Sequence, residues 1–346
     1  MARVFLTGAS GLIGGALLAR LVARGETVAA LARSDAAAAA VAAHGAEVVR
    51  GDVLDEVALA AGIRGSDLVY HVAGINTFCP TDPAALFAVN VRGAEAVVRA
   101  AARAGAGRIV LTSSASSLGE EHGTVGSEDS PHRGSYMSVY ERSKHEGEVA
   151  ALAAARRAGI DLVAVNPSSV QGPGRAGGTG RILIAYLNGR LKAFVDTRLS
   201  LVDIRDCVEG HLLAAQRGVP GERYVLNGVT LTSLEALEIV SGLTGITDRP
   251  RILPPAAATA VATLVEGGFR LARRKPPFCR EMVRTMLHGH RYDGTRATRE
   301  LGLQYAPVRE TLAGTVAWAL AQGLVTRPLP AWDEDAASAG PAAGIP

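Results

Sequence analysis

Short apolar runs alternate with helical patterns along the first half of the chain. The apolar runs predict strands at 4–7, 27–32, 46–50, 67–72, 108–112 and 161–165. Helical periodicity predicts helices at 11–24, 91–103 and 140–157. Alternation of this kind is typical of βαβ units, whose parallel strands form one sheet with helices on both faces. The sequence therefore predicts an α/β fold built on a doubly wound, Rossmann-type parallel sheet.

The pattern changes after residue 170. Glycine and proline mark a loop at 172–178, and helical patterns dominate from Thr179 onward. An apolar run at 201–204 is expected to return as a strand to the sheet or its margin. Helices are expected at 230–244, 298–302 and 311–323.

This change predicts two domains and a tail. Residues 1–170 are expected to form a Rossmann domain, to which residues 195–225 partly return. Residues 171–194 and 226–328 are expected to form a smaller, mostly helical lobe that closes over the edge of the sheet. Residues 329–346 are acidic and then rich in alanine, glycine and proline, which predicts a disordered tail.

Composition excludes several classes of protein. Hydrophobic residues make up 48% of the 346 residues and charged residues 20%, as is typical of globular proteins. The net charge is +3 and the positive residues are scattered, so nothing indicates nucleic-acid binding. No apolar stretch reaches the roughly 18–20 residues that a membrane-spanning helix needs. We therefore expect a cytoplasmic protein that binds neither nucleic acid nor membrane.

The three cysteines, Cys79, Cys207 and Cys279, lie far apart and show no Cys-x-x-Cys spacing. Few histidines lie near them. This arrangement predicts neither a disulfide framework nor a zinc site, and we expect no bound metal. It also fits a reducing cytoplasm.

Three glycines, Gly8, Gly11 and Gly14, stand between the first strand and the first helix. In a dinucleotide site the first permits a tight turn, the second lets backbone N–H groups approach a pyrophosphate, and the third allows close helix–strand packing. A purely structural turn is the alternative in a chain with 40 glycines. The strand–turn–helix context favours the dinucleotide site. Its predicted members are Gly8, Ser10, Gly11, Leu12, Ile13 and Gly14.

The end of the second strand discriminates between NAD and NADP. An acidic residue there would accept hydrogen bonds from the ribose hydroxyls of NAD, whereas this chain has Arg33 and Ser34. Arg33 can pair with a 2′-phosphate and stack on adenine, and Ser34 can add a hydroxyl donor. A solvated arginine is the alternative. The pattern favours NADP(H) over NAD, so that residues 1–170 become an NADP-binding domain.

Two more strand ends are expected to follow the cofactor. Asp52, at the end of the third strand, could accept from the adenine amino group, with Val53 beside it. Val72, Ala73 and Gly74 close the fourth strand with small residues where the cofactor would cross the edge of the sheet. A tight strand end is the alternative for these three.

Tyr140 and Lys144 are four residues apart on a predicted helix and therefore share a face. A lysine ammonium stabilises a phenolate, so Lys144 is expected to lower the pKa of Tyr140 from about 10 and could also hold ribose hydroxyls. A surface Tyr–Lys pair is the alternative. Ser114 follows the fifth strand and could orient a substrate oxygen towards Tyr140. A serine hydrolase is disfavoured because the sequence lacks a Gly-x-Ser-x-Gly elbow.

Taken in order, these motifs resemble the extended short-chain dehydrogenase/reductase superfamily, also known as the NAD-dependent epimerase/dehydratase superfamily. The resemblance covers about residues 3–325. The matching motifs lie at 7–14, 51–53, 71–74, 90–93, 112–114, 140–144, 166–168, 172–174, 203–211 and 299–303.

The resemblance implies roles for individual residues. Ser114, Tyr140 and Lys144 would be the catalytic set, with Ser113 close to the cofactor. Asn90 would shape the active site. A homodimer would form through the helices 91–103 and 140–157. The residues implied to flank the nicotinamide are Pro167, Ser169 and Val170.

Within the superfamily, Arg33 and the C-terminal half resemble the dihydroflavonol reductase, 3β-hydroxysteroid dehydrogenase and hopanoid-associated epimerase-like branch. Nucleotide-sugar epimerases usually carry an aspartate at the end of the second strand and Tyr-Gly after the serine motif. This chain has Ala32-Arg33 and Leu118-Gly119 at those places, which disfavours a sugar-nucleotide substrate.

The resemblance therefore implies an NADP-dependent oxidoreductase, a ketoreductase or the reverse alcohol dehydrogenase, acting on a small or medium apolar molecule. Tyr140 would be its general acid or base. The alternative is an epimerase or dehydratase that keeps NAD(P) bound and acts on a sugar or sugar-nucleotide. A non-catalytic redox sensor is disfavoured because the Ser-Tyr-Lys set is intact. Phe78, Met137 and Gln171 are expected to line the substrate pocket.

Overall fold

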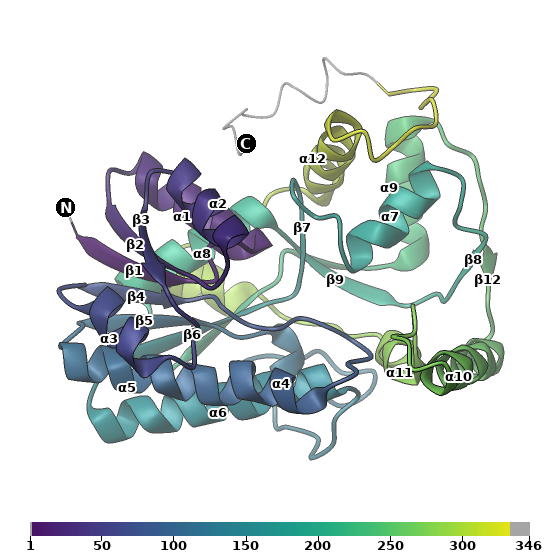
Figure 1. Ribbon diagram of the computed structural model, residues 1–346. Helices are drawn as coiled ribbons and strands as arrows, with labels where there is room; N and C mark the ends of the chain where they lie inside the picture. The colour runs from purple at the N-terminus through teal and green to yellow at the C-terminus, as the bar shows by residue number, and fades with distance from the viewer. Residues whose placement is uncertain (1, 333–346) are drawn as a thin grey trace.

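A seven-stranded sheet forms the centre of the larger lobe in the computed structural model, which describes residues 2–332 (Figure 1). Every pairing in the sheet is parallel, and the strand order is β10-β6-β5-β4-β1-β2-β3. The predicted doubly wound parallel sheet is therefore confirmed. Its strands are β1 (Arg3–Thr7), β2 (Thr27–Ala32), β3 (Glu47–Arg50), β4 (Leu68–His71), β5 (Arg108–Thr112), β6 (Asp161–Pro167) and β10 (Arg223–Leu226).

Helices cover both faces of this sheet (Figure 1). β1 shows why: Phe5 packs into one buried cluster while Val4 and Leu6 pack into the other, because successive side chains of a strand point to opposite faces. A parallel sheet buried on both faces is built from such continuous apolar strands. One face carries α1 (Leu12–Ala23), α2 (Asp35–Ala43) and α8 (Ile204–Arg217), and the other carries α3 (Glu56–Ile63), α5 (Ala94–Ala104) and α6 (Val139–Ala158).

The smaller lobe is mostly helical. Three of its helices, α7 (Thr179–Leu187), α9 (Ser233–Thr244) and α12 (Val308–Ala321), share one apolar cluster. Two others, α10 (Pro255–Leu271) and α11 (Arg280–His288), pack on each other near the edge of the sheet (Figure 1). Two small sheets complete the lobe. They are formed by β7 (Ser169–Gln171), β9 (Arg198–Asp203) and β11 (Val229–Thr232), and by β8 (Ala193–Phe194) and β12 (Arg251–Ile252).

Short helical segments fill the connections. The helix predicted at 91–103 is preceded by α4 (Pro83–Phe87) and begins as a π-helical segment, η1 (Ala88–Gly93), before α5. A 3₁₀ turn, η2 (Ala115–Leu118), follows β5, and a second π-helical segment, η3 (Ala297–Leu301), replaces the helix predicted at 298–302.

The smaller lobe departs from the predicted elements at its strands. Of the run at 201–204, residues 201–203 end β9 and Ile204 begins α8; β9 lies in the three-stranded sheet at the margin, one of the two predicted positions. The helix predicted at 230–244 starts only at Ser233, because the β-branched residues before it pair with β9 as β11. Thr232 caps that helix in a capping box with Glu235.

The chain passes between the lobes more than once. β10 extends the main sheet beside β6, and Leu301 and Leu303 are buried in the core of the larger lobe. The predicted domain boundaries stay a prediction. Of the predicted tail 329–346, residues 333–346 lie outside the described part, and Trp332 packs against the cluster of α7, α9 and α12. Within residues 2–332 no helix is long and apolar enough to span a membrane.

Two cysteines form a disulfide, contrary to the prediction. Cys79 follows β4 and Cys279 precedes α11, and their Cα atoms are 5.9 Å apart. They are 200 residues apart in the chain and meet only because α10 and α11 fold back towards the edge of the sheet. Spacing in the sequence could not show this. The cysteines therefore no longer support a reducing, cytoplasmic location.

The packing of α6 on η1 depends on one glycine. A Cβ atom at Gly147 would lie 2.2 Å from the carbonyl oxygen of Asn90. Gly147→Ala should therefore lower the free energy of unfolding by about 1–3 kcal/mol, the usual effect of overpacking. Gly267→Ala in α10, where a Cβ meets nothing within 4 Å, is the matched control and should be neutral or slightly stabilising. Urea unfolding of the three proteins checks this, and equal stabilities would contradict the packing described.

Candidate active site

One cleft of about 1310 Å³ runs along the edge of the sheet where the strands end, and residues of both lobes line it. Because the strands are parallel, the carboxyl ends of β1 to β6 meet at this single edge. Ligands of open α/β sheets bind at such an edge. The cleft is therefore the candidate site.

The glycine turn at one part of the cleft leaves no room for side chains. A Cβ at Gly8 would lie 2.5 Å from the backbone nitrogen of Ala73, and a Cβ at Gly14 would lie 2.1 Å from the Gly8 carbonyl oxygen. Gly8 also has a φ of +77°, which favours glycine. No side chain of the described residues caps α1, and its first turn holds no acidic residue. Its N–H groups are thus available to a phosphate.

Arg33 lies on the rim of the same cleft, at the end of β2. Its side chain is 74% exposed, and its guanidinium lies 3.5 Å from Asp52 Oδ2. Asp52 also accepts from the Leu54 N–H, and the Ser34 hydroxyl caps α2 by accepting from the Ala37 N–H. An exposed guanidinium with one loose ion pair can still bind a phosphate.

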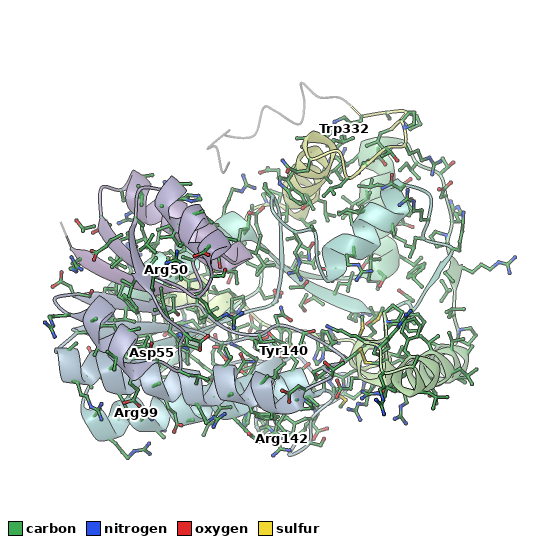
Figure 2. All side chains as sticks on the ribbon, viewed as in Figure 1. Arg50, Asp55, Arg99, Tyr140, Arg142 and Trp332 are labelled. Carbon is green, nitrogen blue, oxygen red and sulfur yellow. A yellow bond between two sulfur atoms is a disulfide. The ribbon has the colours of Figure 1, made fainter. Side chains whose placement is uncertain are left out.

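Ser114 and Tyr140 line the cleft from two different elements. Ser114 follows β5, and its Oγ lies 2.9 Å from Ser116 Oγ. Tyr140 stands in the first turn of α6, at the end of that helix nearer to α11 (Figure 2), and its ring is 5.8 Å from the ring of Phe78. Burial raises the pKa of Tyr140, while the hydrogen bond with Ser114 and the charge of Arg175 act in the opposite direction.

Lys144 lies behind the cleft lining and not on it. Its Nζ donates to the Thr112 carbonyl oxygen at 2.8 Å. Burial lowers the pKa of Lys144 to about 8, although the charge of Glu148 opposes this. The pKa of Tyr140 is raised overall because burial of the phenol dominates, and the Lys144 ammonium donates to a strand carbonyl, so the expected effect of Lys144 on Tyr140 stays a prediction.

Asn90 also lies behind the lining. Its Oδ1 accepts from the Ile75 N–H at 2.8 Å and its Nδ2 donates to Ser143 Oγ at 2.9 Å, so it ties the loop after β4 to α6. The other predicted site residues reach the cleft. They are Gly8, Ser10, Gly11, Leu12, Ile13, Gly14, Arg33, Ser34, Asp52, Val53, Val72, Ala73, Gly74, Ser113, Ser114, Tyr140, Pro167, Ser169 and Val170.

The predicted substrate-pocket residues are only partly right. Phe78 lines the cleft, whereas Met137 and Gln171 do not. Gln171 is buried and its amide donates to Thr179 Oγ1 at 2.6 Å, so it holds the loop before α7.

Several cleft residues were missed in the sequence. His290 and Tyr292 are examples, and segments of the smaller lobe at 197–200 and 282–286 contribute others. They belong to loops and helix ends whose position depends on how the smaller lobe folds back. The glycine-rich stretch 171–180 was the one sequence signal for this side of the cleft, and it reaches the cleft through Arg175 and Thr179.

Together these features define a class of protein. A dinucleotide-type glycine turn, a strand-end serine and a helix tyrosine share one cleft of a Rossmann fold, as in extended short-chain dehydrogenases/reductases. The chain belongs to the NAD dependent epimerase/dehydratase family, whose model matches residues 4–226. This confirms the resemblance seen in the sequence.

Known relatives match nearly the whole chain. Sterol demethylase protein B of Methylococcus capsulatus is 35% identical over 332 residues, which cover 92% of this chain and 99% of that protein. A putative dihydroflavonol 4-reductase of Synechocystis is 31% identical over 329 residues, which cover 93% and 95%. Among solved structures, a nucleoside-diphosphate-sugar epimerase from Pseudomonas aeruginosa has a TM-score of 0.76 at 25% identity, with 94% of this chain and 99% of that one covered. The chain therefore belongs to a family of enzymes, and some of its relatives are named as reductases.

The lowered pKa of Lys144 makes stability depend on pH. An unfolded lysine has a pKa of about 10.4, so between pH 8 and that value the folded protein binds fewer protons than the unfolded chain. The contribution of Lys144 to the free energy of unfolding should therefore rise with pH across this window. Lys144→Met should remove that rise.

Urea unfolding at several pH values from 7 to 10 measures this difference between wild type and variant. Lys192→Met, at an exposed lysine, is the control and should keep the wild-type pH dependence. Identical pH dependence in wild type and Lys144→Met would show that Lys144 is not buried as described.

Proposed function

We propose that this protein is an NADP(H)-dependent oxidoreductase that interconverts a carbonyl and an alcohol on a small or medium apolar molecule. The observation that carries the proposal is the shared cleft, on which Ser114 and Tyr140 stand with the glycine turn and Arg33. The family is described as NAD dependent. The preference for NADP(H) rests on Arg33 at the place where NAD sites usually carry an acidic residue.

The residues of the cleft fit a dinucleotide. The N-terminus of α1 would bind the pyrophosphate, Arg33 the 2′-phosphate, and Pro167, Ser169 and Val170 would flank the nicotinamide ring. When bound, the cofactor supplies or accepts the hydride.

The protein's own side chains would handle the oxygen and its proton. Ser114 would donate a hydrogen bond to the substrate oxygen and hold it near Tyr140. Tyr140 would give its phenolic proton to that oxygen in reduction and take a proton back in oxidation. Lys144 stands one turn further along α6, and its charge would reduce the energetic cost of the phenolate.

The chemistry of the cleft favours an apolar substrate. Ile182, Leu199, Met282 and Met286 line it from the smaller lobe, and Phe78 lines it from the loop after β4. Two relatives carry names that refer to a sterol and to a dihydroflavonol, both built from several fused or linked rings, and a sterol is largely apolar.

We also propose that the protein forms a homodimer through α5 and α6 and that it is located in the cytoplasm. Measurement of the molecular mass in solution tests the homodimer, and localisation in cells tests the cytoplasmic location.

A panel of ketones, aldehydes and alcohols tests the proposal. With a true substrate, the near-ultraviolet absorbance of NADPH should fall as the carbonyl is reduced. The second candidate is an epimerase that keeps its cofactor, which the likeness to the Pseudomonas aeruginosa epimerase favours. Conversion of a substrate without any net change in NADPH would support this candidate and contradict the oxidoreductase.

Tyr140→Phe should lower the rate of turnover by about 10²–10⁴-fold, because phenylalanine has no proton to transfer. Affinity for NADPH should stay nearly unchanged, as measured by fluorescence titration. Tyr136→Phe, at a tyrosine outside the cleft lining, is the matched control and should retain activity. Wild-type turnover in Tyr140→Phe would remove Tyr140 from the mechanism.

Arg33→Ala should weaken NADPH binding by about 10- to 100-fold, since one charge-assisted contact with the 2′-phosphate is lost. NADH binding should change little. Arg50→Ala is the control, because Arg50, labelled in Figure 2, forms an exposed ion pair with Asp35 and does not line the cleft. Equal losses for NADPH and NADH would contradict the phosphate role.

A further inference from the structure

A second group of chemically active side chains lies where the smaller lobe meets the loop after η2. Glu120 comes from that loop, and His288 and His290 stand on either side of Gly289 at the end of α11. One ligand atom from each of the three lies within 4.8 Å of the others. Glu120 and His290 are 170 residues apart, so only the fold assembles the group. The expectation of no metal site rested on cysteine spacing and did not consider these residues.

Two imidazoles share one carboxylate in this group. Glu120 Oε1 lies 2.6 Å from His290 Nδ1 and 3.6 Å from His288 Nε2. Ligand atoms bound about 2.0–2.2 Å from a tetrahedral zinc ion are roughly 3.3–3.6 Å from one another. Small side-chain shifts would therefore let the three atoms surround one ion.

The group is buried and has spare bonding capacity. The side chain of Glu120 is 1% exposed, that of His288 4% and that of His290 14%. Glu120 Oε2 and His290 Nε2 are both buried without a hydrogen-bond partner among residues 2–332. Buried polar atoms in native proteins nearly always have partners. The free oxygen of the Glu120 carboxylate therefore points to a ligand that the protein alone does not supply.

The surrounding structure fixes the group in place. The Gly126 N–H donates to the Arg291 carbonyl oxygen, and the Asp293 N–H donates to the Gly126 carbonyl oxygen. Arg133 donates to the Glu120 carbonyl oxygen at 2.9 Å, and its charge is balanced by an ion pair with Glu141. His288 lies in the last turn of α11, and the carbonyl end of a helix favours a cation.

We propose that Glu120, His288 and His290 bind one divalent transition-metal ion of the Zn²⁺ or Co²⁺ type. Two imidazole nitrogens and one carboxylate oxygen suit these ions, whereas Mg²⁺ and Ca²⁺ prefer oxygen ligands alone. The ion would join the loop after η2 to the end of α11 and so hold the two lobes together. His290 lines the cleft, so a fourth coordination position would be reachable from it. The proposal goes beyond the proposed function and does not depend on it.

Metal titration of the full, untagged chain tests the site without substrate or cofactor. After treatment with a chelator, the protein should bind one Zn²⁺ per chain in calorimetry and unfold at a higher temperature when Zn²⁺ is added. Co²⁺ should give the visible absorption of a tetrahedral nitrogen and oxygen site. Mg²⁺ should produce neither effect. Failure of the wild-type protein to bind Zn²⁺ stoichiometrically would overturn the proposal.

Variants identify the ligands. Glu120→Gln and His288→Asn should each weaken Zn²⁺ binding at least about tenfold. His44→Asn, at a partly exposed histidine outside the group, should bind Zn²⁺ like the wild type. Circular dichroism shows which variants fold. If Glu120→Gln does not fold, the Zn²⁺ affinity of His288→Asn tests the assignment of the ligands. Unchanged Zn²⁺ affinity in a folded ligand variant would refute the assignment, whereas loss of NADPH turnover with intact Zn²⁺ binding would count against the proposed function alone.

Discussion

The common direction of the seven strands is the constraint from which the site follows. Since parallel strands end at the same edge, the polar or small residues that follow them converge there, even though they are far apart in the chain. The turn after β1, Arg33 after β2, Asp52 after β3 and Ser114 after β5 meet in this way. Helices cover both faces of the sheet, so a ligand can reach the strand ends only at this edge. Nothing in the chemistry of one residue would produce the cleft without this alignment.

The smaller lobe completes what the sheet begins. Its apolar residues form the far wall of the cleft, and it is attached to the larger lobe by contacts of several kinds. The Cys79–Cys279 disulfide and the hydrogen bond from Lys275 to Thr77 tie α11 and the segment before it to the loop after β4. Backbone hydrogen bonds between Gly126 and the segment after α11 tie it to the loop after η2. The wall is therefore held at more than one point along its length.

Sequence patterns predicted well those parts whose cause is local. The strand 27–32 and the strand 108–112 match β2 and β5 to the residue, because each is a continuous apolar run between clear turn signals. The glycine turn and the position of Tyr140 were predictable for the same reason, since the turn directly follows a strand and Tyr140 lies in the first turn of a helix.

What the sequence could not predict depends on long-range packing. Lys144 shares a helix face with Tyr140, yet its ammonium binds a strand carbonyl, a partner 32 residues away that periodicity cannot indicate. The meeting of Cys79 with Cys279, and of Glu120 with His290, requires the path of the whole smaller lobe. Residues 230–232 were predicted as helix from the local pattern, but they form part of β11 because pairing with β9 outweighs that pattern.

The Cys79–Cys279 bond also gives the chain a different topology from that of an ordinary two-lobed protein. Residues 79 to 279 form a closed covalent ring that includes most of the central helices and strands and much of the smaller lobe. A single break of the backbone anywhere in that ring opens it but leaves both pieces covalently joined. The same ring limits how far the ends of the segment can separate in the unfolded chain, which lowers the entropy of the unfolded state. After such a break the two pieces of the chain therefore stay joined, even where the non-covalent contacts between the lobes are lost.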